Sequence, residues 1–137
     1  MFSVRLLENS DYATLVGWWK ANRFPPPGMN DLPLFEGEMQ GVMVFEGAVE
    51  ICAGFLIDLS IPNAAMIEYI VANFEVKDRS LRKGALILLI NSLKDLAKSM
   101  GKKYVFTSVK NKNLIDKLEA ARFVVGSAHT TEMIAVL

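Results

Sequence analysis

The first part of the chain alternates between strand-like and helix-like patterns. In residues 2–6, apolar side chains alternate with polar ones, which is typical of a strand with one buried face. In residues 12–19, apolar side chains recur at helical spacing behind a polar cluster that supplies capping groups. Consecutive prolines then remove backbone donors, so residues 25–33 are expected to form an irregular loop.

Strand patterns dominate the middle of the chain. Residues 41–45 and 49–57 are two apolar runs around a turn that contains Gly47, and we expect them to form a hairpin. Residues 66–76 are strongly apolar and rich in residues that favour strands. This run therefore predicts a central strand that is covered on both faces.

Two helices are expected in the rest of the chain. Apolar side chains repeat at helical spacing over residues 86–100, and Gly101 fits the position that ends such a helix. A second helix is predicted over residues 111–121.

Three more strands are expected, at residues 104–109, 123–125 and 133–137. The element order predicts a mixed α/β fold whose first half is antiparallel.

Length and composition narrow the class of protein. A chain of 137 residues fits one domain, 1–137, and 52% hydrophobic residues can fill its core. No apolar run approaches the ~20 residues that span a bilayer, and the first residues lack a signal-peptide pattern. Cys52 is the only cysteine, so it forms no internal disulfide, and a reducing cytoplasm suits the protein.

The charges are balanced overall but unevenly distributed. Fifteen basic and fifteen acidic residues give a formal net charge of zero, which argues against a nucleic-acid surface built on bulk positive charge. Residues 1–76 hold 3 Lys/Arg against 10 Asp/Glu, whereas residues 77–137 hold 12 against 5. Either one side of the domain prefers an anionic ligand and the other a cationic one, or solvated surface charges merely segregate.

Three segments, together with the element order, resemble the GNAT superfamily of acyl-CoA N-acyltransferases over nearly the whole chain. Residues 51–56 look like the family's small-Gly-apolar step between its second and third strands. Residues 76–86 are similar in spacing to its V-x-P-x-x-[RQ]-x-x-G-x-[GA] segment. Residues 111–123 match the spacing of its N-x-x-A-x-x-L-Y-x-K-x-G-F helix. The resemblance implies a twisted, mostly antiparallel sheet of six to seven strands, with helices on both faces.

Three further stretches make the resemblance more specific. Residues 18–20, the proline loop and residues 67–71 look like small GNAT-like proteins of tailed phages. Trp18, Trp19 and Phe24 occupy the region that borders the acceptor site in the family. They form either a wall for a peptide or aromatic substrate, or a set of anchors that pin the loop to the core.

The resemblance implies acetyl-CoA, or another acyl-CoA, as cosubstrate. A pyrophosphate binds the unpaired N–H groups and positive dipole end of the helix that follows the central strand. The strands at 66–76 and 104–109 are expected to splay apart, so that the pantetheine arm pairs with exposed backbone. The implied cofactor-binding residues are Phe74, Glu75, Val76, Leu81, Arg82, Lys83, Gly84, Ala85 and Asn111.

Several of these positions depart from the family pattern. Leu81 stands where the family has Arg or Gln, and Leu86 takes the second small position. Leu118 replaces the Tyr that protonates the departing thiolate. Arg79, together with Arg82 and Lys83, compensates in part through charge. The alternative is an ordinary basic helix N-terminus with solvated side chains, and Asn111 has the alternative role of an N-cap.

Glu68 is the candidate catalytic base. Its place on the central strand resembles that of the general-base Glu in the histone-acetylating branch of the family. If no bulge intervenes, the strand places Glu68 on the same face as Ile70 and Ala72. The alternative is that Glu68 pairs with a surface Lys or Arg. Tyr69 and Glu75 are weaker candidates for the base, and their alternatives are packing and a solvated side chain respectively.

The sequence therefore predicts an N-acetyltransferase that acts by direct attack of an amine on the thioester. Backbone N–H groups of residues 74–76 would polarise the thioester carbonyl while Glu68 relays the proton. The partner is a small-molecule or peptide amine, with no nucleic acid, membrane or metal, and a homodimer stays open. The alternative is a non-catalytic GNAT-fold binding or virion-associated module that has lost its cofactor loop.

Overall fold

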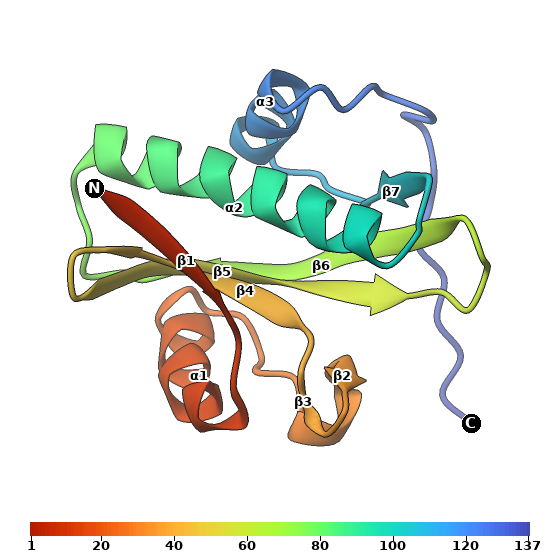
Figure 1. Ribbon diagram of the computed structural model, residues 1–137. Helices are drawn as coiled ribbons and strands as arrows, with labels where there is room; N and C mark the ends of the chain where they lie inside the picture. Colours follow the sequence, from red (N-terminus) through yellow and green to blue (C-terminus); the bar gives the residue numbers. More distant parts are fainter.

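The computed structural model describes residues 1–137 and shows a five-stranded sheet with helices on both faces, α1 on one and α2 and α3 on the other (Figure 1). The strands of this sheet are β1 (Phe2–Leu6), β4 (Gly41–Glu46), β5 (Val49–Asp58), β6 (Ala64–Ala72) and β7 (Tyr104–Phe106). The helices are α1 (Tyr12–Ala21), α2 (Arg79–Ser99) and α3 (Lys112–Ala120). The mixed, mostly antiparallel fold predicted from the sequence is confirmed.

The strands lie in the order β1-β4-β5-β6-β7, and each neighbouring pair is antiparallel except β6 and β7, which are parallel. The β6–β7 pairing is short: it runs only from Ala64 opposite Tyr104 to Met66 opposite Phe106. Just beyond it, the Thr107 hydroxyl donates to the Ile67 carbonyl over 2.8 Å. From there the two strands part, as the resemblance implied.

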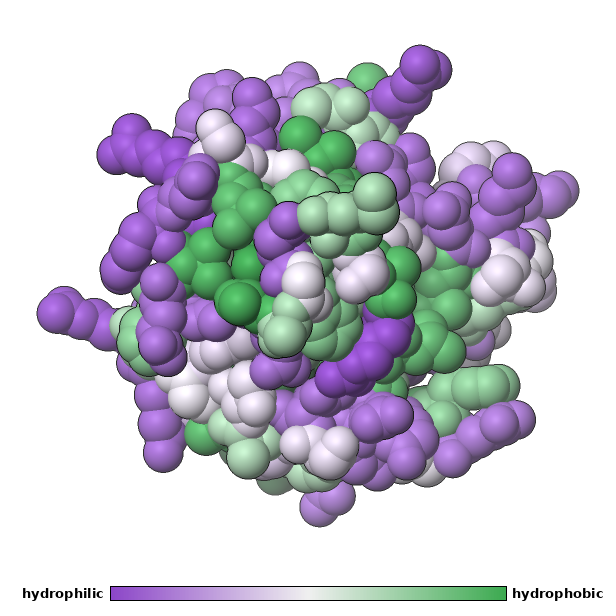
Figure 2. Space-filling view, turned by 60° about the vertical axis from the view of Figure 1, so that its left-hand side comes forward, coloured by the Kyte–Doolittle hydropathy of each residue, from purple (hydrophilic) through white to green (hydrophobic).

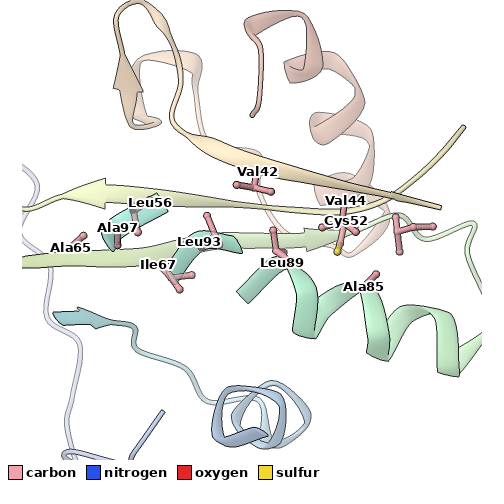
Figure 3. Close-up of a cluster of buried hydrophobic side chains, with 11 residues drawn as sticks. Val42, Val44, Cys52, Leu56, Ala65, Ile67, Ala85, Leu89, Leu93 and Ala97 are labelled. Atoms are coloured by element: carbon pink, nitrogen blue, oxygen red, sulfur yellow. The ribbon is translucent and has the colours of Figure 1, made fainter. Parts of the chain in front are cut away.

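The sheet separates two apolar cores. On one face, α2 presents Ala85, Leu89, Leu93 and Ala97 toward side chains of the central strands (Figure 3). These four residues are four positions apart, so they form a single stripe along the helix. On the other face, α1 buries Trp18 and Trp19 against a second cluster. Both faces of the central strands are therefore covered, as their continuous apolar runs predict.

A buried ion pair fixes the start of α1 against β1. The Asp11 side chain is buried, and both of its oxygens accept from the Arg5 guanidinium, over 2.7 and 2.8 Å. Burial alone would raise the pKa of Asp11, but the Arg5 hydrogen bonds and the Glu8 N–H outweigh it and hold that pKa below its ordinary value.

Several element boundaries differ from the predictions: β6 begins at Ala64 rather than at residue 66, and β7 ends at Phe106 rather than at residue 109. The central strand ends at Ala72 rather than at residue 76. The Asn73 side chain is the reason: its amide donates to the Glu50 carbonyl over 2.8 Å, and its oxygen accepts from the Glu75 N–H over 3.0 Å, which turns the chain. Helix α2 begins at Arg79, well before the apolar repeat that predicted it, because Asp78 caps it.

The predicted closing β pair is wrong. Residues 123–125 and 133–137 form no strand, so the main sheet has five strands rather than six or seven. Two further strands, β2 (Leu34–Phe35) and β3 (Glu38–Met39), form a separate small hairpin that the prediction of an irregular loop did not include.

None of the helices combines the length and the apolar composition that crossing a membrane requires. In one space-filling view, apolar side chains gather in the middle of the face, with hydrophilic ones around them (Figure 2).

Candidate active site

A large cleft opens where β6 and β7 part. Its volume is about 1270 Å³. Strand β6 contributes residues 67–72, and the other walls come from the start of α2, the segment after β7, the start of α3 and the end of α1. The polar side chains that line it are Asn22, Glu68, Tyr69, Arg79, Arg82, Lys83, Thr107, Asn111, Asn113, Lys117 and Glu132. The cleft is thus built by segments that lie far apart in the sequence.

A β-bulge in β6 forms part of this cleft. Ala53 of β5 lies opposite Val71, but Phe55, two residues on, lies opposite Glu68, so β6 carries one extra residue between the two pairs. Within it, Tyr69 has a φ of 58°, in the left-handed region that a residue with a bulky side chain rarely adopts. Such strain persists only where the surrounding fold imposes it, and it is concentrated at functional sites.

The bulge changes the face to which Glu68 belongs. Glu68 lies opposite Phe55, whose side chain is buried in the α1-side core, whereas Ile70 and Ala72 pack on the α2-side core. The prediction that Glu68 shares a face with Ile70 and Ala72 is therefore wrong, because the bulge intervenes. Glu68 nevertheless lines the cleft, and it makes no ion pair with any Lys or Arg.

Tyr69 brings a second polar group to the same place. Its ring lies nearly perpendicular to that of Phe55, with ring centroids 6.0 Å apart, and its hydroxyl has no hydrogen-bond partner within the protein. Burial, followed by the nearby carboxylates of Glu68 and Asp31, raises the pKa of Tyr69. The hydroxyl therefore stays protonated at neutral pH. The sequence indicates Tyr69 only as a weaker candidate for the base, with packing as its alternative, since nothing in its pattern reveals the bulge.

Cations line the opposite side of the cleft. Arg79 and Lys83 of α2 line it and make no hydrogen bond or ion pair within the protein. Arg82 is engaged instead: it donates to the carbonyls of Asn73 and Val76, over 3.2 and 2.8 Å, and holds the turn against the helix. Lys117 of α3 also lines the cleft. The basic half of the sequence therefore meets Glu68, from the acidic half, across one cleft.

The backbone N–H groups at the start of α2 are partly engaged within the helix. Asp78 accepts from the Leu81 N–H through its side chain, over 3.1 Å, and from the Arg82 N–H through its carbonyl, over 3.0 Å. Amides further along point into the helix. A Cβ added to Gly84 would lie 2.9 Å from the Phe2 ring, so Gly84 allows β1 to pack closely and does not line the cleft. Ala85 is buried in the α2-side core.

The remaining predicted cofactor residues are spread around the site. Residues 74–76 lie in the turn after β6 and do not line the cleft, and the N–H groups of Glu75 and Val76 are used within that turn. Asn111 lines the cleft and caps α3, accepting from the Leu114 N–H over 3.1 Å. Leu118 is buried between α2 and α3.

The aromatic residues near α1 divide into two groups. Trp18 and Trp19 are buried in the core, which fits the alternative that they anchor the loop, and Trp19 also contributes to the cleft wall. Phe24 is half exposed and lines the cleft beside Asn22.

Comparisons with known proteins identify the architecture. No protein-family model and no curated protein sequence matches the chain. Among solved structures, the protein TTHA1254 from Thermus thermophilus is 16% identical, with 96% of each chain covered and a TM-score of 0.69. The YncA protein from Salmonella typhimurium, solved with its cofactor acetyl-CoA, is 14% identical over 92% of this chain and 81% of its own, with a TM-score of 0.68.

A third similar structure carries the family name. It is a GNAT family acetyltransferase from Staphylococcus aureus, 15% identical over 97% of this chain and 98% of its own, with a TM-score of 0.60. The structural similarity extends over nearly the full length of these chains. At sequence identities this low, it shows that the fold is shared. The chain has the fold of the GNAT acetyltransferases.

Proposed function

We propose that this protein transfers an acetyl group from acetyl-CoA, or another acyl group from its CoA thioester, to an amine. The observation that carries the proposal is the cleft at the parting of β6 and β7, which is lined by cations of α2 and α3 and by Glu68 of β6. A protein of the same fold, YncA, was solved with acetyl-CoA. A polyanionic cosubstrate and a cationic acceptor match the two sides in charge.

Side-chain cations would bind the phosphates of the cosubstrate. Of the N–H groups at the start of α2, the Asp78 side chain engages that of Leu81, which leaves those of Arg79 and Ser80. Arg79 and Lys83 carry full charges, are unpaired and line the cleft, and Lys117 adds a third charge from α3. Arg82 would act mainly on the shape of the turn. Phosphate binding by these side chains would therefore depend on charge more strongly than phosphate binding by a set of backbone N–H groups does.

Glu68 would serve as the base. The acceptor nitrogen attacks the thioester carbonyl, the C–S bond breaks, and the proton of the nitrogen passes to the Glu68 carboxylate. The CoA thiolate takes its proton from water, since Leu118 offers none. The Tyr69 hydroxyl, protonated and unpartnered beside Glu68, would donate a hydrogen bond to the bound reactants.

The other nucleophile in the cleft does not support an acyl-enzyme route. Cys52 contributes to the cleft wall, but its side chain is buried, and burial raises the pKa of its thiol to about 12. A thiol with that pKa is almost wholly protonated at neutral pH, and the thiolate is the nucleophilic form. Direct attack by the amine is therefore the mechanism proposed.

A second candidate function is a binding module without catalysis. The Asp78 carboxylate stands at the start of α2, where it competes with an anion for the same amides. Leu118 supplies no acid, and Gly84 packs against Phe2. These observations favour a protein that has kept the fold while its ligand has changed.

Removing the two unpaired cations tests the proposed cofactor site. We expect the double variant Arg79→Gln, Lys83→Gln to bind acetyl-CoA about 100-fold more weakly, because a charged hydrogen bond contributes roughly 1.5 kcal/mol and 1.4 kcal/mol is a tenfold change. Isothermal titration calorimetry measures the affinity. Raising the salt concentration should weaken binding by the native protein more than binding by the variant.

The matched control for this double variant removes two cations elsewhere. Lys98 near the end of α2 and Lys110 before α3 are exposed and do not line the cleft. The variant Lys98→Gln, Lys110→Gln should bind acetyl-CoA as the native protein does. Equal affinities for the two double variants would contradict the assignment of the phosphates to Arg79 and Lys83.

A further inference from the structure

Strands β6 and β7 end their pairing with a side chain in place of a backbone group. The Asn63 carbonyl, just before β6, accepts from the Tyr104 N–H over 2.8 Å. Such bonds repeat every two residues along both strands of a parallel pair, so a continued ladder would join the Ile67 carbonyl to the Ser108 N–H. Instead, the Ile67 carbonyl accepts from the Thr107 hydroxyl over 2.8 Å, and the Ser108 N–H makes no hydrogen bond.

The sequence favours a longer β7 than the structure has. Residues 104–109 carry a strand pattern, yet β7 ends at Phe106, directly before Thr107. Thr side chains that bond a nearby backbone group compete with regular pairing. The Thr107 hydroxyl therefore occupies the acceptor that the next backbone bond of the ladder requires.

The bulge in β6 does not account for this end of the pairing. Its extra residue lies between Glu68 and Val71. Ile67 precedes it and lies opposite Leu56 of β5 in regular register. The Ile67 carbonyl is thus in place for a backbone partner, and only its donor differs from that of a regular ladder.

The bond between Thr107 and Ile67 lies where the cleft begins. Ile67, Thr107 and Val109 line the cleft, and the chain after β7 runs toward α3 (Figure 1). The peptide group that carries the Ile67 carbonyl also carries the N–H of Glu68, the proposed base. A further ladder bond would bring the segment after β7 against β6 beside Glu68, and it would narrow the cleft there.

We propose that the Thr107 hydroxyl ends the ladder between β6 and β7 and thereby holds the cleft open beside Glu68. Thr107 is a positioning residue, because it contacts the backbone next to Glu68. Without the hydroxyl, the buried Ile67 carbonyl lacks a partner, and pairing with the Ser108 N–H supplies one. The pairing then advances by one step. The effect on acetyl-CoA rests on the proposed function, whereas the effect on the ladder does not.

Residue-resolved hydrogen exchange, followed by NMR, tests the effect on the ladder. Thr107→Val keeps the shape of the side chain but loses the hydroxyl, whereas Thr107→Ser keeps the hydroxyl. We expect the Ser108 amide to be unprotected in the native protein and in Thr107→Ser, and to exchange about tenfold more slowly in Thr107→Val. The matched control is Thr130→Val, because Thr130 is exposed and does not line the cleft. It should leave the exchange of the Ser108 amide unchanged.

Two results of this experiment would overturn the inference. A Ser108 amide that is protected in the native protein would show that the ladder continues past Thr107. Equal exchange of this amide in Thr107→Val and in the native protein would show that another part of the fold ends the pairing.

Calorimetric titration with acetyl-CoA tests the effect on the cleft. If the ligand needs the open cleft, a tenfold slower exchange of the Ser108 amide corresponds to an affinity about tenfold lower, because only the unpaired fraction binds. We expect that loss in Thr107→Val and near-native affinity in Thr107→Ser. Slower exchange with unchanged affinity would overturn the claim that Thr107 holds the cleft open. A native protein that binds no acetyl-CoA would contradict the proposed function, and the exchange of Ser108 would still decide the role of Thr107.

Discussion

Replacing Glu68 by Gln is expected to lower the rate of acetyl transfer about 100-fold or more, while the affinity for acetyl-CoA stays nearly unchanged. Gln keeps the size of the side chain and an oxygen that accepts hydrogen bonds, but it does not take up a proton at neutral pH. Since Glu68 makes no ion pair, the substitution leaves no buried cation without its partner. Its effect on the free energy of unfolding is therefore small.

Thiol release from acetyl-CoA measures the rate. The acceptors to be screened are polyamines, aminoglycosides and basic peptides, first with the native protein and then with Glu68→Gln. Glu119→Gln is the matched control, because Glu119 is exposed on α3 and does not line the cleft. Equal rates for Glu68→Gln and the native protein would remove Glu68 as the base. No thiol release with any amine would favour the binding module.

Replacing Phe55 by Ala is expected to lower the free energy of unfolding by about 4 kcal/mol, the usual loss for a large buried aromatic residue. Phe55 is fully buried in the α1-side core. It stacks on Trp19, with ring centroids 6.2 Å apart, and meets the edge of Tyr69. Because Phe55 also lies opposite Glu68, its removal loosens the support of the bulge as well as the core.

Urea denaturation measures this loss, with the slope of the transition unchanged. Phe35→Ala is the control, since Phe35 lies in the small β2–β3 hairpin and is mostly exposed. It should change the free energy of unfolding by no more than about 0.5 kcal/mol. A loss below about 1 kcal/mol for Phe55→Ala would show that this core does not hold the bulged strand in place.

Hydrophobic periodicity predicted most of the fold. The hairpin of β4 and β5, the burial of α1 and the stripe on α2 follow from apolar spacing alone. The predicted ends of elements are wrong where the hydrogen bonds of a single side chain outweigh the apolar periodicity. Asn73 ends β6 early through two side-chain hydrogen bonds, and Asp78 starts α2 early as its cap. Apolar periodicity carries no information about such bonds.

Residues 133–137 show a different limit of the sequence pattern. Their apolar run is typical of a strand, but a strand forms only when its backbone pairs with that of a neighbouring strand. These residues make no backbone hydrogen bond, so they form no strand in the structure. Apolar patterning therefore indicates that a segment favours a strand, but it does not show whether the segment is paired.

The candidate site was predicted in part. Glu68 and the cations at the start of α2 were identified from their positions, and the cleft contains them. The face of Glu68 and the place of Tyr69 depend on the bulge, which arises from the mismatch between β5 and β6 and has no local sequence signal. Gly84 matches the family spacing but packs against Phe2, because spacing does not show what a glycine faces.

The melting temperature with and without acetyl-CoA is the most direct test of the proposal that this cleft binds an acyl-CoA. A ligand at ~100 times its dissociation constant stabilises the folded state by about 2.7 kcal/mol, which for a domain of this size is a shift of several degrees. We expect that shift with acetyl-CoA and a much smaller one with inorganic pyrophosphate. An unchanged melting temperature at millimolar acetyl-CoA, or an equal shift with pyrophosphate, would contradict the proposal.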